Sequence, residues 1–281
     1  MTRLYLHLSA ILSAIFILVI PVVLLFSSLP FWMSEGLAPI GGSDWYPYEN
    51  LYGLLPAIVG TIWAVIIAFA IAIPSGISSA IIFSELTGSR LSATYRVVME
   101  MVSAIPSIVY GLIGLAVGLP MIESLFDLPT GHSLFLAGMV LALMILPTFT
   151  LMSLDAISSV SVEQRESAMN LGLSFRDLLL RVLLPQAWPA IRSAILLSAG
   201  RALGETMAVM LLVGSIDRLP DPLYNILAPA QTLTSKIGRE IGEAAYGSIH
   251  FSALMASGAL LAVMSLVIAM MANIKDYRTA Q

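Results

Sequence analysis

The stretch at residues 161–191, SVEQRESAMNLGLSFRDLLLRVLLPQAWPAI, interrupts a chain that is otherwise strongly apolar. Two helix-start patterns lie within it. Ser161 followed by Gln164 predicts a capping box, in which each side chain bonds the backbone of the other residue. Ser174 followed by Asp177 repeats this pattern. The stretch therefore predicts two short helices in succession, both more polar than the segments around them.

Gly172 lies between these two starts, where the first helix has to stop and reverse, a position that favours left-handed backbone. We predict helices at about 162–171 and 175–184, with Pro185 helping to end the second. The result is a polar helical hairpin, and its role depends on what surrounds it.

The composition is that of a polytopic membrane protein. The chain has 281 residues, 58% hydrophobic and 11% charged, with a mean hydropathy of +0.94, whereas a typical soluble domain has about 25% charged residues. The net charge of −4, without a basic block, does not indicate a nucleic-acid partner. Cysteine is absent and the three histidines form no metal motif, so we predict no disulfide, metal or cofactor site.

Six segments are long and apolar enough to cross a bilayer, which predicts an all-α membrane fold. The first is too long for the apolar region of a signal peptide, so we expect it to be a retained span. We divide the chain into residues 1–53, a first span with an acidic outer loop, and a core at 54–281. The second segment is long enough to tilt or break at Pro74. The predicted spans are 8–30, 54–83, 97–120, 132–153, 193–216 and 250–273.

Lys and Arg residues predict the orientation. Nine of them fall on one side of the predicted spans, four of these in the loop that contains the hairpin, and three fall on the other side. Both termini and the hairpin are therefore expected in the cytoplasm. The nine are Arg3, Arg90, Arg96, Arg165, Arg176, Arg181, Arg192, Lys275 and Arg278; the three are Arg218, Lys236 and Arg239.

The hairpin resembles the EAA signature of ABC importer permeases, a Glu-Ala-Ala and Gly pattern followed after a fixed spacing by Ile-x-Leu-Pro. Here the signature reads ESAMNLG and then VLLP, with Ser167 in place of Ala and Val182 in place of Ile. The resemblance implies a type I importer fold and a coupling helix that docks on a separate ATPase subunit. An unrelated surface hairpin is the alternative. The matching residues are Glu166, Ala168, Gly172, Leu184 and Pro185.

Polar residues also occur within the predicted spans: Arg201 and Glu205 in the fifth, Ser103 and Ser107 in the third, and Ser75 in the second. At 1.5 Å per residue, Pro74, Ser107, Arg201 and Glu205 fall about 12–18 Å inside these spans. Prolines at such depth free backbone carbonyls, which are tolerated where they line a cavity. We therefore predict a polar pathway near the midplane.

A buried Arg201 needs a partner because a charge at this depth is costly. Glu205, four residues on, would share its helix face, so a structural ion pair is one reading. The segments that contain the serines can likewise be helix kinks or sites of close helix packing. The other reading is an anion pathway, because guanidinium groups suit tetrahedral oxyanions. A nearby carboxylate could accept the proton that phosphate has near pH 7 and sulfate lacks.

The segments GRALGETMAV, IPSIVYGLIGL and GTIWAVIIAFAIAIPSGISSAIIFSEL resemble the membrane subunits of phosphate-specific (Pst) ABC importers, more the PstC type than the PstA type. This resemblance implies transport of inorganic phosphate across the bacterial inner membrane. It also implies four kinds of partner: membrane lipid, a second homologous permease in a heterodimer, two cytoplasmic ATPase subunits and an external phosphate-binding protein.

Three other functions remain as alternatives. The first is a permease for another oxyanion such as phosphonate. The second is a secondary anion transporter or channel, which favours inverted repeats that the sequence lacks. The third is an intramembrane enzyme, for which no nucleophile and base spacing is recognisable. Because no Walker A sequence occurs, we expect ATP to be hydrolysed by another chain.

Overall fold

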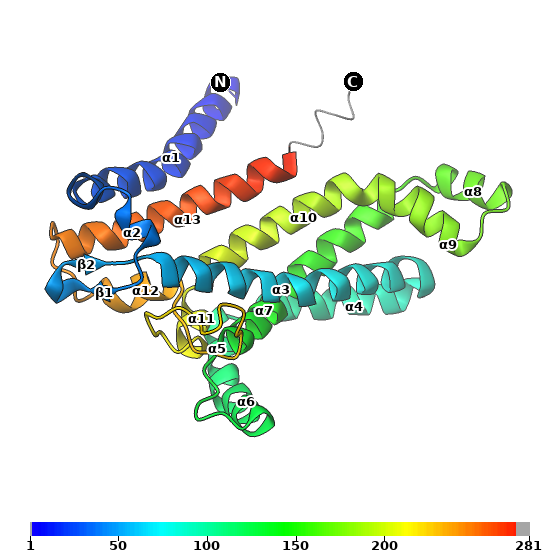
Figure 1. The fold of residues 1–281 in the computed structure, drawn as a ribbon. Coiled ribbons are helices and arrows are strands. Elements are labelled where there is room, and N and C mark those ends of the chain that lie inside the picture. Colours follow the sequence, from blue (N-terminus) through cyan, green and yellow to red (C-terminus); the bar gives the residue numbers. More distant parts are fainter. Residues whose placement is uncertain (1, 274–281) are drawn as a thin grey trace.

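The computed structural model describes residues 2–273 and is mostly helical (Figure 1). Two short strands form an antiparallel hairpin in the loop between the first two spans, and three helices are extended by π-helical turns. The elements are α1 (Thr2–Glu35), α2 (Ala38–Gly41), β1 (Trp45–Tyr46), a 3₁₀ turn (Pro47–Glu49), β2 (Leu51–Tyr52), α3 (Leu55–Ile81) with a π turn (Ile82–Leu86), α4 (Ser89–Ser103), α5 (Ser107–Ile113) with a π turn (Gly114–Gly118), α6 (Leu119–Phe126), α7 (Leu134–Ser158), α8 (Val162–Asn170), α9 (Phe175–Leu178) with a π turn (Leu179–Leu183), α10 (Leu184–Gly204), α11 (Met207–Leu212), α12 (Leu233–Glu240) and α13 (Ile249–Asn273).

Six helices of the described chain are long and apolar enough to cross a membrane, which confirms the predicted all-α membrane fold. The first, second, fourth and sixth lie close to their predicted positions. In the bundle, α3 and α10 pack against α7, while α1 packs along α13. The six helices are Ser9–Glu35, Leu55–Leu86, Ser107–Phe126, Leu134–Ser158, Phe175–Gly204 and Ile249–Met270.

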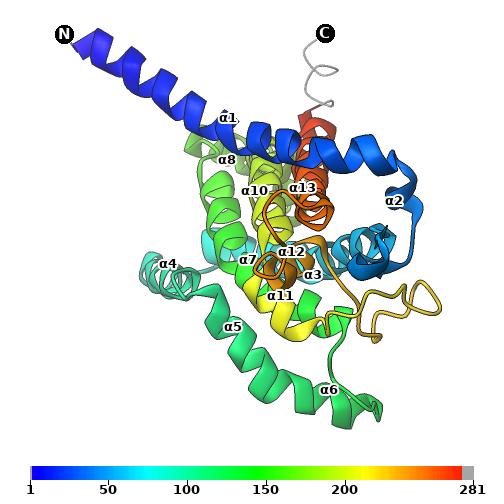
Figure 2. The same cartoon turned by 90° about the vertical axis from the view of Figure 1, so that its left-hand side faces the viewer.

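The third span differs from the prediction at 97–120. The chain breaks between α4 and α5, and the apolar helix begins only at Ser107. Pro106 explains the break, because proline lacks an N–H donor and disfavours helical backbone in the residue before it. The helix α4 before the break is amphipathic and has no buried residues. Ser107 therefore starts a half-helix and does not lie in the middle of one. Figure 2 shows α5 and α6 diverging from the bundle after this break.

The fifth span also differs from the prediction at 193–216, because it starts earlier and ends at Gly204. The second hairpin helix does not end at Pro185. It continues through the π turn Leu179–Leu183 into α10, with Pro185 in the first turn of α10. A π turn relaxes the usual hydrogen-bond register, so the helix tolerates the missing N–H of the proline. The second hairpin helix and the fifth span thus form one continuous helix, Phe175–Gly204.

The second span continues through Pro74, which lies inside α3 without a break. The neighbouring Ser75 donates a hydrogen bond to the carbonyl of Ile71 in its own helix. The predicted tail with Lys275 and Arg278 lies outside the described residues.

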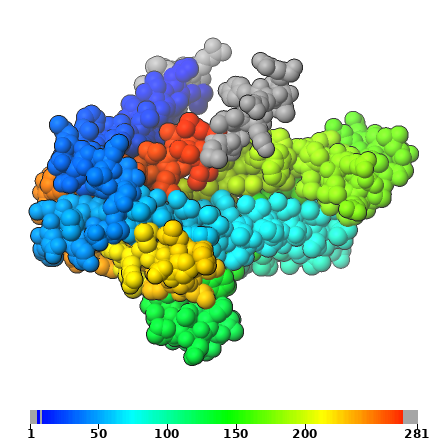
Figure 3. Space-filling view, in the orientation of Figure 1, coloured from blue at the N-terminus to red at the C-terminus, as the bar shows by residue number. Residues whose placement is uncertain are grey.

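The two ends of the bundle have different structures (Figures 1 and 3). At one end, α8 and α9 form a protruding knob beside the end of α3. At the other, the β-hairpin and α12 lie together, joined by a hydrogen bond from Trp45 to Glu240. The segments predicted on the basic side, 84–96 and 154–192, therefore share one end. Those predicted at 31–53 and 217–249 share the other.

Candidate functional site

The predicted polar hairpin is present, with α8 ending at Asn170 and α9 starting at Phe175. Gly172 has φ +77°, and no atom lies within 4 Å of the position of an added Cβ. Glycine is thus favoured by backbone conformation and not by lack of space. Ser174 Oγ accepts a hydrogen bond from Asp177 N at 3.2 Å and donates one to Asp177 Oδ2 at 2.7 Å.

The other predicted cap is not formed. Ser161 occupies the N-cap position of α8, but its side chain makes no capping hydrogen bond, so the expected capping box with Gln164 is wrong. Position 161 nevertheless has the extended backbone of an N-cap, with φ −61° and ψ 145°. The sequence pattern therefore located the helix start but not its hydrogen bonds.

The residues of the EAA-like signature divide between two faces of the hairpin. Ala168 is buried in an apolar cluster with Leu183 and Ile157, and Leu184 is packed against that cluster. A small residue at 168 lets α8 lie close on the spans. Glu166, Gly172 and Pro185 are exposed. Two apolar side chains at the tip, Met169 and Leu171, are 56% and 81% exposed. This tip offers an apolar surface bordered by charge, a combination typical of interaction sites.

Arg201 lies in the last turn of α10, where a cation is favoured by the helix dipole. Its Nη1 donates a hydrogen bond to Thr148 Oγ1 of α7 at 3.0 Å. Glu205 follows the end of the helix with extended backbone, ψ 122°, and its Oε1 accepts a hydrogen bond from Ala208 N at 3.1 Å at the start of α11. The expectation that Arg201 and Glu205 share a helix face is wrong, because the helix ends between them, and no ion pair joins these two described residues.

A second helix break lies beside Arg201. The Tyr110 hydroxyl donates a hydrogen bond to the Val102 carbonyl at 2.8 Å, across the interruption at residues 104–106. Arg201 is within electrostatic range of this tyrosine. The arginine therefore adjoins the interruption after α10 and faces the region of the residue that bonds across the interruption after α4.

The half-helices that follow the two breaks run side by side in the same direction. A Cβ added to Gly111 would lie 2.9 Å from Ala208 Cα, and one added to Gly114 would lie 2.7 Å from Leu212 Cδ1. The absence of side chains on these glycines permits the close packing. Since the contacts advance together along both helices, the two half-helices run in parallel, and Met207 lies about one turn further along than Ser107.

The other predicted pathway serines make local bonds. Ser103 Oγ donates to the Glu100 carbonyl at 2.8 Å, and Ser75 bonds its own helix as described above. Ser107 begins α5 and is partly buried. The structure thus brings Ser107, Arg201 and Glu205 to one region through the paired breaks. The assignment of all five residues to a pathway stays a prediction.

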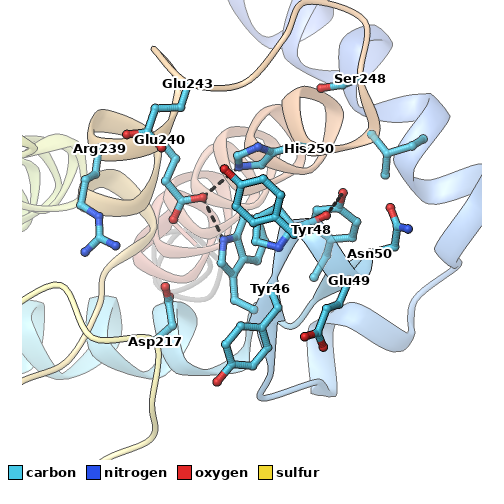
Figure 4. A pocket seen from close by; sticks show the side chains of 14 residues that line it. Tyr46, Tyr48, Glu49, Asn50, Asp217, Arg239, Glu240, Glu243, Ser248 and His250 are labelled. Atoms are coloured by element: carbon cyan, nitrogen blue, oxygen red, sulfur yellow. Dashed lines mark hydrogen bonds and ion pairs between the residues drawn. The ribbon is translucent and has the colours of Figure 1, made fainter.

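A charged cluster at the opposite end of the bundle from the hairpin was not expected from the sequence; Figure 4 shows its Asp217, Glu240 and His250 side chains. The fully buried Lys236 pairs with Asp217, lies 4.0 Å from Glu240, and stands 3.7 Å from the ring centroid of Trp45. Glu240 also accepts hydrogen bonds from Trp45 Nε1 and His250 Nε2, each at 2.9 Å. Burial lowers the pKa of Lys236, and the two carboxylates oppose this shift.

This cluster joins α12 to the loop between the first two spans and to α13. Sequence reasoning treated Lys236 as a surface charge, and the signal that it missed is the spacing of Thr232 and Ser235, which form a true capping box. The box fixes the start of α12 and so aims Lys236 inward. Among the described residues, no group of three or more His, Asp or Glu side chains could hold a metal ion.

A family model described as binding-protein-dependent transport system inner membrane component matches residues 72–278. The probable ABC transporter permease protein YqgH of Bacillus subtilis is 36% identical over 239 residues, which cover 83% of this chain and 76% of that protein. The phosphate transport system permease protein PstC of Pasteurella multocida is 34% identical over 264 residues, with 87% and 81% covered.

Solved structures of ABC transporters have the same fold at low sequence identity. A chain of a bacterial alginate ABC transporter superposes with a TM-score of 0.66 and 18% identity, covering 100% of this chain and 96% of that one. A chain of the MetNI methionine ABC transporter, in an inward-facing conformation, gives 0.57 and 17%, covering 81% and 94%. The fold of this chain is therefore that of known ABC transporter chains.

Proposed function

Because the chain belongs to the family of binding-protein-dependent transport system inner membrane components, we propose that it is a PstC-type membrane subunit of an ATP-driven importer of inorganic phosphate. The observation that carries this proposal is the position of Arg201 at the break after α10, whose following half-helix packs in parallel with the half-helix that follows the break at Pro106. The relatives named PstC support the choice of phosphate.

Interrupted helices are a physical means of binding an anion within a membrane. The N-terminal end of a helix has unpaired N–H groups and a partial positive charge, and transporters direct such ends at anionic substrates. Here the two half-helices starting at Ser107 and Met207 run in parallel with their N-terminal ends about one turn apart, and Arg201 adds a full charge. Its guanidinium has further N–H groups besides the one bonded to Thr148.

Glu205 supplies the means of selecting phosphate. One of its carboxylate oxygens accepts a hydrogen bond from the N–H of Ala208, and the other can accept a hydrogen bond from a protonated ligand. Phosphate near neutral pH has a hydrogen to donate, whereas sulfate does not. An unprotonated anion such as sulfate would instead place one of its oxygens against the Glu205 carboxylate, and neither group has a hydrogen to donate.

The hairpin is proposed as the site of coupling to the ATPase, through Glu166, Ala168, Gly172, Leu184 and Pro185. Its exposed tip residues Met169 and Leu171 supply apolar contact area, and its continuity with α10 carries movement towards Arg201. ATP would then be hydrolysed on the partner subunits and not on this chain. This assignment places the hairpin and both termini in the cytoplasm, with the Lys236 cluster outside.

The proposal includes three partners besides lipid: a second homologous permease, cytoplasmic ATPase subunits and an external phosphate-binding protein. The exposed apolar side chains along α5 and α6, among them Leu112, Val117 and Leu125, suit lipid or the second permease. A permease for phosphonate or another oxyanion, or a secondary anion transporter, remains the alternative that the experiment separates.

The test is reconstitution of the purified complex in liposomes. With ATP inside and phosphate-loaded binding protein outside, we expect labelled phosphate to accumulate in the vesicles. Omission of ATP or of the binding protein should abolish the uptake. Excess unlabelled sulfate should not compete, and excess phosphonate should compete weakly. Uptake without ATP would indicate a secondary transporter, and uptake of phosphonate in preference to phosphate would reject the proposed substrate.

A further inference from the structure

Arg165 of α8 is the most extensively bonded arginine in the hairpin. Its Nη1 donates to both carboxylate oxygens of Glu85 at 2.6 Å, its Nη2 to the Ile157 carbonyl at 2.7 Å, and its Nε to the Val160 carbonyl at 3.2 Å. The side chains of Arg165 and Glu85 are only 18% and 9% exposed.

Three of the four acceptors belong to two other spans, and the fourth, the Val160 carbonyl, lies in the short linker between α7 and α8. Glu85 lies in the π turn that ends the second span, and Ile157 lies in the last turn of α7. The final carbonyls of a helix have no partner within it, so Arg165 satisfies groups that would otherwise need water. One side chain therefore joins the first hairpin helix to the ends of α3 and α7.

This connection is separate from the covalent path through Gly172 and α9 into α10. An ion pair that is mostly buried is costly to break, because one charge is then left without a partner. Displacing α8 thus requires either that the ends of α3 and α7 move with it or that the bonds of Arg165 are lost. The α7 helix also contains Thr148, which holds Arg201.

We propose that Arg165 is a positioning residue that transmits movement of α8 to α3 and α7, with Glu85 as its receiving partner. This inference rests on the proposed coupling role of the hairpin. The fourth and fifth spans are both joined to α8 through the chain itself, whereas Arg165 links α8 to the second span through Glu85 and fixes it to the end of the fourth. Hydrolysis and transport are then held in a fixed ratio because the spans move together.

The experiment measures phosphate transported per ATP hydrolysed by the complete importer in liposomes. Arg165→Gln and Glu85→Gln should each keep the ATPase bound but lower this ratio about fivefold or more, the range of a typical coupling energy. Arg165→Lys should give an intermediate ratio, because an ammonium can face Glu85 but cannot reach both carbonyls as well. The double variant should have a transport-to-hydrolysis ratio no lower than that of either single variant, since the two residues act as a unit.

Arg181→Gln is the matched control. Arg181 is in the same hairpin and pairs with Asp177 at 3.1 Å, but this i,i+4 pair is exposed and joins no second span. The Arg181→Gln complex should transport as much phosphate per ATP hydrolysed as the wild type, because exposed ion pairs contribute little energy.

Unchanged ratios in both Arg165→Gln and Glu85→Gln would overturn the inference while leaving ATP-driven transport intact. Should Arg165→Gln fail to assemble, Glu85→Gln decides alone, since it lies outside the hairpin and leaves its backbone unaltered. A wild-type complex that lacks a bound ATPase or does not transport phosphate would instead reject the proposed function, and the inference with it.

Discussion

At the scale of single residues, Arg201 is held by Thr148, and this partner decides how replacements should behave. Arg201→Gln removes a charged ligand, and a hydrogen bond to a charged group contributes about 1.5–3 kcal/mol. We therefore expect phosphate uptake to fall about 10- to 100-fold at limiting phosphate. Arg201→Lys should also be impaired, because the compact ammonium group does not replace the paired hydrogen bonds of a planar guanidinium. The measurement is labelled-phosphate uptake at matched membrane levels of protein.

The double variant Arg201→Gln with Glu205→Gln separates a substrate role from a structural pair. Because Glu205 bonds the backbone of Ala208 and not Arg201, neutralising both residues should leave uptake impaired. ATPase co-purification is the folding control for each variant. Full uptake by the double variant would show that the two charges only balance each other.

Lys236 gives a prediction about stability. Lys236→Met would leave Asp217 and Glu240 without their buried cation, which typically costs about 3–5 kcal/mol. The thermal unfolding midpoint of the purified complex should fall clearly. The matched control is Arg218→Gln, which makes the same change of net charge at an exposed position in the same loop region. It should change stability by about 0.5 kcal/mol or less. Equal midpoints for the two variants would contradict a structural role for the cluster.

At the scale of elements, the hairpin was predictable and the helix breaks were not. Gly172 and the polar residues around it mark a reversal by local chemistry alone. Hydropathy cannot detect the breaks at 104–106 and 205–206, because an apolar window is averaged across them. Pro106 signalled the first break in retrospect. The second depends on the side chain of Glu205 capping α11 from a position that ordinary helix pattern would place inside a continuous span.

Gly172 gives a prediction about the turn of the hairpin. Gly172→Val places a β-branched residue at φ +77°, where such residues are strained. We expect the subunit to insert but its ATPase binding or stimulation to drop, because the corner must distort. Gly172→Asn is the matched control, since asparagine tolerates left-handed backbone and no atom lies close enough to clash. ATPase activity of the purified complex is measured with loaded binding protein. Coupled uptake at wild-type level in Gly172→Val would reject the predicted corner.

At the scale of the whole molecule, the sequence predicted six spans and two different ends, because hydropathy and polar loops report on the solvent around each segment. It could not predict that Trp45 would meet Glu240 or that Arg165 would meet Glu85, since these contacts join residues far apart in the chain. The division into residues 1–53 and 54–281 stays a prediction. Within the described residues α1 packs along α13, so the first span is integrated with the last.

The orientation of the whole molecule is predicted from the nine-to-three distribution of basic residues, and the absence of cysteine allows a direct test. Glu163→Cys, on the exposed face of α8, should react with a membrane-impermeant maleimide only after the inner membrane is opened. Pro129→Cys, in the exposed loop after α6, should react in intact spheroplasts. The cysteine-free parent is the background control, and uptake by each variant shows that it is folded. The reverse labelling pattern would place the hairpin outside, where it could meet no ATP-hydrolysing partner, and would overturn the coupling argument together with the topology.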